Sequence, residues 1–207
     1  MSQPSDTSAP AHTSPGAMAE YDFGERKMLV QIAHEAILAL VEGREISFPT
    51  PSPHLAEPRG VFTSLYSDGK LRGCVGFPVA TLSLFKAVAE TARAAASEDP
   101  RFAPVSLPEA RTLRISISIL SPLSSIMPSE VEIGRHGLVI FDGARRGLLL
   151  PQVPVEHGWD RNTFLEQTCL KAGLPHDAWR AGAHIEAFTA EVFGDSDFAT
   201  PGDPFGK

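Results

Sequence analysis

The stretch Asp68-Gly69-Lys70-Leu71-Arg72-Gly73-Cys74-Val75-Gly76 decides the fold of this chain, because a tight turn in it leads directly into a strand. The Asp-Gly pair is a strong signal for the turn of a β-hairpin. Residues 61–66, on the other side of the turn, alternate in the way that a half-buried strand does. We therefore expect two antiparallel strands, 61–66 and 71–77, joined by the turn 67–70.

Helices are predicted on both sides of this hairpin. Apolar residues recur at helical spacing over residues 20–42, and Gly43 is a stop signal at the end of that stretch. Between 44 and 60, four prolines predict an extended loop. Thr81 is placed to cap a second helix, and residues 97–100 would end it because the position before a proline disfavours helical backbone.

The second half of the chain adds strands and one more long helix. Residues 113–120 alternate most regularly, with aliphatic side chains on one face. A second hairpin is predicted from 137–141 and 147–150. A helix through Lys171 and a last strand over 184–193 complete the pattern. Helices and antiparallel strands are mixed without a repeating β-α-β order, so we predict an α+β fold with a mainly antiparallel sheet and flanking helices.

Length and composition limit the class of protein. With 207 residues and 43% apolar side chains, we expect one domain over 20–193, between a disordered tail at 1–19 and a flexible tail at 194–207. The net charge of −7 argues against a basic surface that binds nucleic acid. We recognise no membrane-spanning run and no secretion signal, so a cytoplasmic protein is expected.

Cys74 is the first candidate catalytic residue. In a regular strand its side chain shares a face with Arg72 and Gly76, while the opposite face is apolar and should pack on the core. A guanidinium beside a thiol favours the thiolate, which is the nucleophilic form of cysteine. Gly73 and Gly76 would let a ligand, or another segment of backbone, approach closely. These four residues predict a site for a ligand or a nucleophile.

The same residues have a structural interpretation. In a sheet that is covered on both faces, Cys74 would be a small buried hydrophobic residue. Arg72 would then form an ion pair with an acidic neighbour: Asp68, Glu98 or Asp99. The reactivity of the Cys74 thiol towards iodoacetamide separates the two interpretations.

Two more residues are candidates for acid–base catalysis. Glu98 could act with Asp99 as a general acid or base, or the pair could cap the local turn. His157 lies at the end of a predicted loop, 151–158, just before a helix N-terminus, where loops often contribute to sites.

Arginines are the candidate ligand-binding cations. Arg101 and Arg146, together with Arg72, could bind a phosphate or carboxylate, since a guanidinium matches the geometry of both anions. Arg146 could equally belong to a solvated hairpin tip. The histidines lack metal-ligand spacing, and the chain contains neither a dinucleotide-binding nor a P-loop fingerprint. We therefore predict no metal and no cofactor.

Several segments, in order along the chain, resemble the AMMECR family, whose bacterial and archaeal members are called AmmeMemoRadiSam system protein A. The segments are 68–76, 98–102, 116–122, 134–138, 146–153 and 171–174. The resemblance implies an α+β fold with a main antiparallel sheet and a smaller second lobe. It also implies association with a Memo-like protein and a radical-SAM protein. Phe77 departs from the family pattern, in which a smaller or β-branched residue is expected.

Two functions are compatible with these features. The first is an enzyme, or an enzyme subunit, that acts on a small anionic or nucleotide-like ligand at the Arg72–Cys74 strand, in a pocket completed by 99–101 and 151–160. The second is a non-catalytic binding or adaptor protein that works with the Memo-like and radical-SAM partners.

Overall fold

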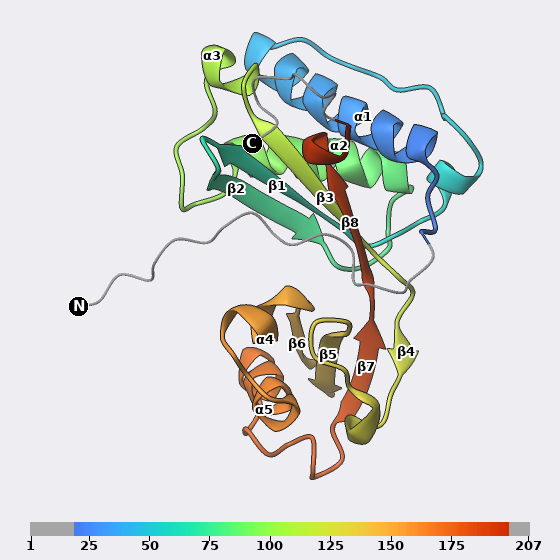
Figure 1. Ribbon diagram of the computed structural model, residues 1–207, viewed down its shortest axis with the longest axis vertical. Coiled ribbons are helices and arrows are strands. Elements are labelled where there is room, and N and C mark those ends of the chain that lie inside the picture. Colours follow the sequence, from blue (N-terminus) through green and yellow to red (C-terminus); the bar gives the residue numbers. More distant parts are fainter. Residues whose placement is uncertain (1–18, 199–207) are drawn as a thin grey trace. The chain divides into compact units, whose positions relative to one another are not determined.

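The computed structural model describes residues 19–198, which divide into two compact units. The first unit consists of residues 19–119 and 191–198, and the second consists of residues 120–190. Each unit contains one four-stranded sheet (Figure 1). The tail predicted at 1–19 and most of the tail predicted at 194–207 lie outside the described residues.

Helix α1 (Phe23–Glu42) opens the first unit, as the apolar spacing predicts. Asp22 caps its N-terminus: the Asp22 carboxylate accepts a hydrogen bond from the Glu25 N–H at 2.8 Å, and the Glu25 carboxylate accepts one from the Asp22 N–H at 3.3 Å. Gly43 ends the helix, because its φ of 68° lies in the left-handed region that glycine adopts at little cost.

The sheet of the first unit has the order β2-β1-β3-β8. β1 (Val61–Ser67) pairs antiparallel with both β2 (Lys70–Phe77) and β3 (Arg114–Leu120), which confirms the predicted hairpin. β8 (Ala190–Gly194) forms the far edge. The 3-10 helix η3 (Asp195–Phe198) follows it, so secondary structure continues past the end of the predicted domain.

Helix α2 (Leu84–Ser97) lies with α1 on one face of this sheet (Figure 1). Its N-cap is Ser83, and the prediction of Thr81 was wrong. The Leu84 N–H donates a hydrogen bond to the Glu57 carbonyl at 2.9 Å, so a contact with a distant loop helps to determine where the helix begins. Two short helices, η1 (His54–Ala56) and α3 (Leu107–Ala110), complete the unit.

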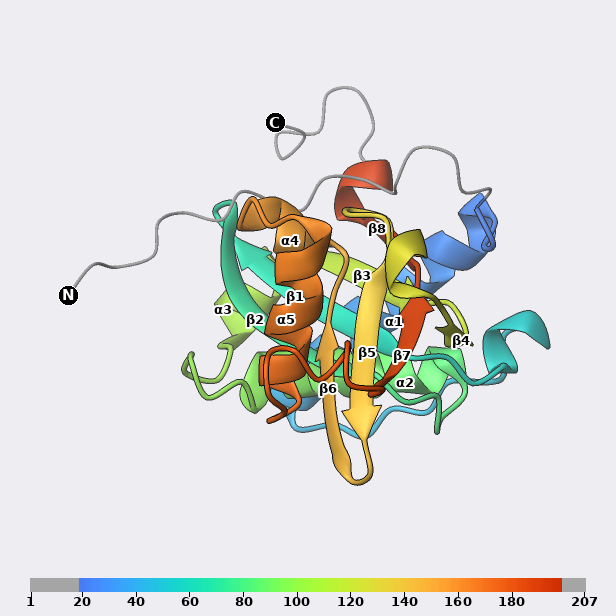
Figure 2. The ribbon, with the colours of Figure 1, turned by 90° about the horizontal axis from the view of Figure 1, so that it is seen from below.

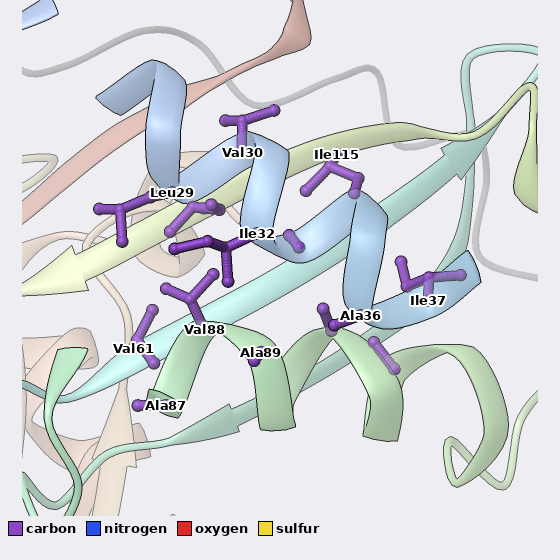
Figure 3. Close-up of a cluster of buried hydrophobic side chains, with 14 of the residues drawn as sticks. Leu29, Val30, Ile32, Ala36, Ile37, Val61, Ala87, Val88, Ala89 and Ile115 are labelled. Carbon is purple, nitrogen blue, oxygen red and sulfur yellow. The ribbon is translucent and has the colours of Figure 1, made fainter. Parts of the chain in front are cut away.

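The core of the first unit lies between the two helices and the sheet (Figure 3). Leu29 of α1, Val88 of α2 and Ile117 of β3 are fully buried. The side of α2 that enters the core is rich in alanine, and these small side chains let the helix approach the sheet and α1 closely. Ile117 therefore faces the core, as the alternation of its strand predicts.

The second unit contains an antiparallel sheet of order β4-β7-β5-β6. Its strands are β4 (Ser124–Ser125), β7 (His184–Phe188), β5 (Gly137–Asp142) and β6 (Arg145–Leu149), and the 3-10 helix η2 (Pro128–Glu130) follows β4. Helix α5 (Arg161–Lys171) lies alongside β6 (Figure 2). The sequence predicts an inward face of Phe164, Leu165, Cys169 and Leu170 for this helix; the first three are buried, but Leu170 is 51% exposed, and its inward placement was wrong.

Two further predictions for this half of the chain were wrong. The loop expected at 151–158 contains the short helix α4 (Gln152–Glu156). The single strand expected at 184–193 is two strands, β7 and β8, which belong to different sheets. Thr189 separates them: the Ser121 N–H donates to the Thr189 carbonyl at 2.9 Å, and the Thr189 N–H donates to the Ser121 hydroxyl oxygen at 3.0 Å.

The described residues therefore combine five α-helices with two antiparallel sheets, and the predicted α+β class is confirmed. Within residues 19–198, every helix is too short or too polar to cross a membrane. The cytoplasmic location stays a prediction.

Candidate functional site

The strand that carries Cys74 contains a β-bulge. Leu65 of β1 is opposite Gly73, whereas the next residue, Tyr66, is opposite Leu71. Arg72 is thus the extra residue on β2 and has no partner residue on β1. Strict alternation of side chains holds from Gly73 onward but does not extend back to Arg72, so the shared face that the sequence predicts for Arg72 and Cys74 does not follow from strand geometry.

Arg72 is held by the segment around α3. Its Nε and Nη2 donate to the Glu109 carboxylate at 2.5 and 3.3 Å, and Nη2 also donates to the Ala103 carbonyl at 2.8 Å. Hydrogen bonding by Arg72 is the largest cause that lowers the pKa of Glu109. Glu109 is therefore the acidic partner, in place of the three that the sequence suggested. The Nη1 of Arg72 is buried and has no hydrogen-bond partner among the described residues.

Cys74 points away from the helices. The preceding residue, Gly73, faces α2, and a Cβ at that position would overlap the carbonyl oxygen of Ala95. Cys74 is half-buried on the opposite face of the sheet. Its Sγ accepts a hydrogen bond at 3.3 Å from the hydroxyl of Ser64, the residue directly across from it on β1. The alternation predicted for Cys74 is borne out by this geometry.

Asp99 connects the strand to the turn after α2. Its side chain is only 3% exposed. Oδ2 accepts hydrogen bonds from the Cys74 N–H at 2.8 Å and from the Arg101 Nη2 at 2.7 Å. Oδ1 accepts from the Arg101 N–H at 3.1 Å and from its Nε at 3.0 Å. These bonds, with the one from the Arg101 side chain contributing most, hold the pKa of Asp99 far below its usual range.

Arg101 is the cation that is both near Cys74 and accessible. Its side chain is 55% exposed, compared with 17% for Arg72. The pKa of Arg101 is raised, first by its hydrogen bonds to Asp99 and further by the negative charge of Asp99 and by its electrostatic interaction with Cys74. The guanidinium carbon lies 5.4 Å from the centroid of the Phe102 ring. An accessible guanidinium therefore stands beside a half-buried thiol.

The two glycines of β2 have roles in packing. Gly73 lets β2 approach the backbone of α2, as described above. At Gly76, a Cβ would overlap the ring of Phe62, which lies across from it on β1. Both glycines therefore allow other parts of the protein to pack closely against β2. The sequence suggested this use as well as the approach of a ligand.

The remaining predicted residues lie elsewhere in the chain. Glu98 is exposed at the C-cap of α2. His157 belongs to the second unit, where it is exposed at the end of α4 and stacks on Trp159 with ring centroids 4.7 Å apart. Arg146, also in the second unit, pairs with Glu186 at 3.4 Å. In the first unit the structure thus brings together Cys74 and Arg101, with Arg72 held beside them.

Sequence reasoning missed one residue and one contact of this site. Ser64 lies opposite Cys74 because of the bulge, whereas counting back through the predicted turn in regular register pairs Cys74 with Thr63. Asp99 was considered as an acid, a cap, a partner of Arg72 and part of the pocket, but its contact with the Cys74 N–H was not expected, because it links residues on different elements. Within residues 19–198, no group of three or more His, Cys, Asp or Glu residues is arranged to hold a metal ion.

Proteins of known sequence and structure resemble this chain over most of its length. Protein MK0488 of Methanopyrus kandleri is 45% identical over 185 residues, which cover 84% of this chain and 89% of that protein. Protein MJ0810 of Methanocaldococcus jannaschii is 43% identical over 179 residues, covering 82% of this chain and 89% of that protein.

A solved structure shares the fold. The crystal structure of the uncharacterized protein PH0010 from Pyrococcus horikoshii has a TM-score of 0.73 and 42% identity to this chain, and the match covers 82% of this chain and 90% of that one. The AMMECR1 family matches residues 30–193, which include both sheets almost completely. The chain therefore belongs to the AMMECR1 family.

Proposed function

We propose that the first unit binds a small anionic ligand beside the thiol of Cys74, and that Arg101 supplies the positive charge. One observation carries this proposal: the buried carboxylate of Asp99 bridges the backbone of Cys74 and the guanidinium of Arg101. The bridge keeps an accessible cation next to a thiol that is itself half-buried on the face of the sheet away from α2.

The N–H donors around Cys74 support an anion more than a cation. Arg72 pairs with Glu109 and Arg101 pairs with Asp99, but the Arg101 side chain is more than half exposed and uses only two of its five N–H donors on Asp99. The buried Nη1 of Arg72 is a further donor that a ligand oxygen or a water molecule would satisfy. A nucleotide-like ligand carries a suitable anionic group in its phosphate.

In an enzyme or enzyme subunit, the Cys74 thiolate would be the nucleophile of this site. The hydroxyl of Ser64 donates a hydrogen bond to Sγ, which would stabilise the negative charge of the thiolate. His157 and Glu98 stay predicted as acid–base groups, and Arg146 stays predicted as a ligand-binding residue.

The test compares two alkylating agents of similar size that differ in charge. Iodoacetate is an anion and iodoacetamide is neutral, so the ratio of their rates at Cys74 reports attraction of an anion to the site. We expect this ratio to fall in Arg101→Gln. Arg44→Gln, which removes an arginine of similar exposure that follows the C-terminus of α1 and pairs with Glu35 and Glu42, should leave the ratio unchanged. A ratio that is the same in wild type and Arg101→Gln would disprove the proposal.

A non-catalytic adaptor that works with Memo-like and radical-SAM partners is the second candidate function. The packing roles of Gly73 and Gly76 favour it, because they explain both glycines without a ligand. Mass spectrometry of the alkylated protein separates the two functions. A Cys74 thiol that reacts only when the protein unfolds, at the same rate as the buried Cys169, would favour the adaptor.

A further inference from the structure

We propose that the ligand is an oxyanion with two coplanar oxygens, a carboxylate or a phosphoryl group, and that it binds the Nη1–Nη2 edge of Arg101. We assign Asp99 as the positioning residue that orients this edge. The inference rests on the proposed function, and it adds a class of ligand and a role for a residue that does not itself touch the ligand.

The first step concerns the donors of Arg101. A guanidinium has five N–H groups, on Nε, Nη1 and Nη2. Asp99 accepts hydrogen bonds from Nε and from one N–H of Nη2. The outer edge, formed by Nη1 and the second N–H of Nη2, donates to no acceptor within residues 19–198. This edge presents two parallel N–H groups, the arrangement that matches two oxygens of one carboxylate or phosphoryl group.

The second step concerns the rigidity of this edge. Asp99 binds Arg101 at three points: the backbone N–H, Nε and Nη2. The ring of Phe102 lies against the guanidinium as well. A side chain that is 55% exposed would otherwise sample many rotamers, and ordering it would oppose ligand binding. Because the carboxylate already fixes the plane of the guanidinium, less entropy is lost when a ligand binds.

The third step concerns why position 99 carries a carboxylate. All four groups that contact its side chain are donors: the N–H groups of Cys74 and Arg101, and the Nε and Nη2 of Arg101. An asparagine would direct its own NH₂ group at two of them. A glutamate keeps the charge but places it one methylene further out, so the same four bonds cannot form together.

The experiment uses variants that preserve charge. Arg101→Lys keeps the cation but has no planar pair of N–H groups, and Asp99→Glu keeps the anion but moves it. For each protein we would measure the ratio of iodoacetate to iodoacetamide rates at Cys74. We would also measure how acetate, inorganic phosphate and chloride, at equal ionic strength, slow alkylation by iodoacetamide.

In wild type, acetate or phosphate should protect Cys74 better than chloride, because a single chloride ion cannot accept two parallel, linear hydrogen bonds from the two N–H groups. Acetate carries the same charge as chloride, so the comparison of these two anions isolates the effect of two oxygens. Arg101→Lys should lose one of two hydrogen bonds, so the rate ratio and the protection should each fall by a factor of roughly 2–10. In Asp99→Glu the rate ratio and the protection should also fall.

The outcomes separate this inference from the proposed function. If wild type and Arg101→Gln have the same rate ratio, the anion site itself is wrong. If the rate ratio shows a preference for iodoacetate in wild type and Arg101→Lys keeps this preference in full, the anion site exists, but the proposed binding of the ligand by the Nη1–Nη2 edge is wrong. Equal protection by chloride and by the oxyanions also overturns the inference. Arg101→Lys changes an exposed side chain and decides the question alone if Asp99→Glu fails to fold, as thermal unfolding would show.

Discussion

The carboxylate of Asp99 takes the place of a neighbouring strand at Cys74. The Cys74 N–H points outward from the edge strand β2, where it donates to Asp99 Oδ2 at 2.8 Å. Edge strands leave such groups unpaired, and proteins protect them in several ways. Here one buried side chain protects the edge and holds Arg101 at the same time, so the stability of the strand and the charge of the site depend on the same residue.

Asp99→Asn should destabilise the protein in a manner that depends on pH. The pKa of Asp99 is lowered in the folded state, so its contribution is fully present above the unfolded value of about 4 and is lost as the pH falls through the folded pKa. We expect a loss of about 1–3 kcal/mol at pH 7 and a smaller loss at pH 2. Urea titrations at both pH values measure this difference. A loss that is equal at pH 7 and pH 2 would contradict the assigned role of the charge.

Arg72→Gln should change Glu109 more than Cys74. Removing the guanidinium takes away the main cause of the lowered pKa of Glu109, which should rise towards its ordinary value. NMR titration of the Glu109 side chain measures this shift. The iodoacetate-to-iodoacetamide ratio at Cys74 should fall less than in Arg101→Gln, because the Arg72 side chain is mostly buried against Glu109 whereas that of Arg101 is accessible. A larger fall would mean that Arg72 is the main cation of the site.

Gly73→Ala should destabilise the first unit more than Gly76→Ala does. The new methyl group at position 73 meets the backbone of Ala95, which cannot move without moving α2. At position 76 it meets the side chain of Phe62, which can rotate. We expect a cost of about 1–3 kcal/mol for Gly73→Ala and less for Gly76→Ala. Denaturant titration of the two variants gives the comparison, and the reverse order would refute the assigned packing.

Ile117→Ala should cost about 2–5 kcal/mol, because truncating a fully buried side chain leaves a cavity. Ser116→Ala is the matched control. It lies next to Ile117 on the opposite, partly exposed face of β3, and should cost less than about 0.5 kcal/mol. Denaturant titration measures both. A similar loss of unfolding free energy in the two variants would mean that the two faces of β3 do not differ in how tightly they are packed.

The parts of the fold that depend on local spacing were predictable. The helix that ends at Gly43, the hairpin around residues 67–70 and the orientation of Cys74 follow from periodicity and turn chemistry. The division of 184–193 between two sheets was not predictable in this way. Alternation has the same period in both strands, and only the partner strands, which are distant in sequence, differ.

The candidate site shows the same limit. The sequence placed Cys74 and Arg101 in it but assigned the neighbouring charge to Arg72. The bulge displaces Arg72 from the regular alternation, and Glu109, far along the chain, holds its guanidinium. Asp99 was noticed for its acidity, whereas its role comes from a hydrogen bond to the backbone of another element. Contacts between residues distant in sequence decide these features, and local patterns do not report them.

The hydrogen bonds between Ser121 and Thr189 have a consequence for synthesis on the ribosome. Residues 120–190 form a unit of their own, inserted between β3 and β8 of the first sheet. β8 is the last strand of that sheet to be translated, so the nascent chain must expose one edge of β3 until the whole insertion has emerged. Because Ser121 and Thr189 join the two ends of the insertion, its folding brings β8 next to its place and shortens the time for which this edge can pair with another nascent chain.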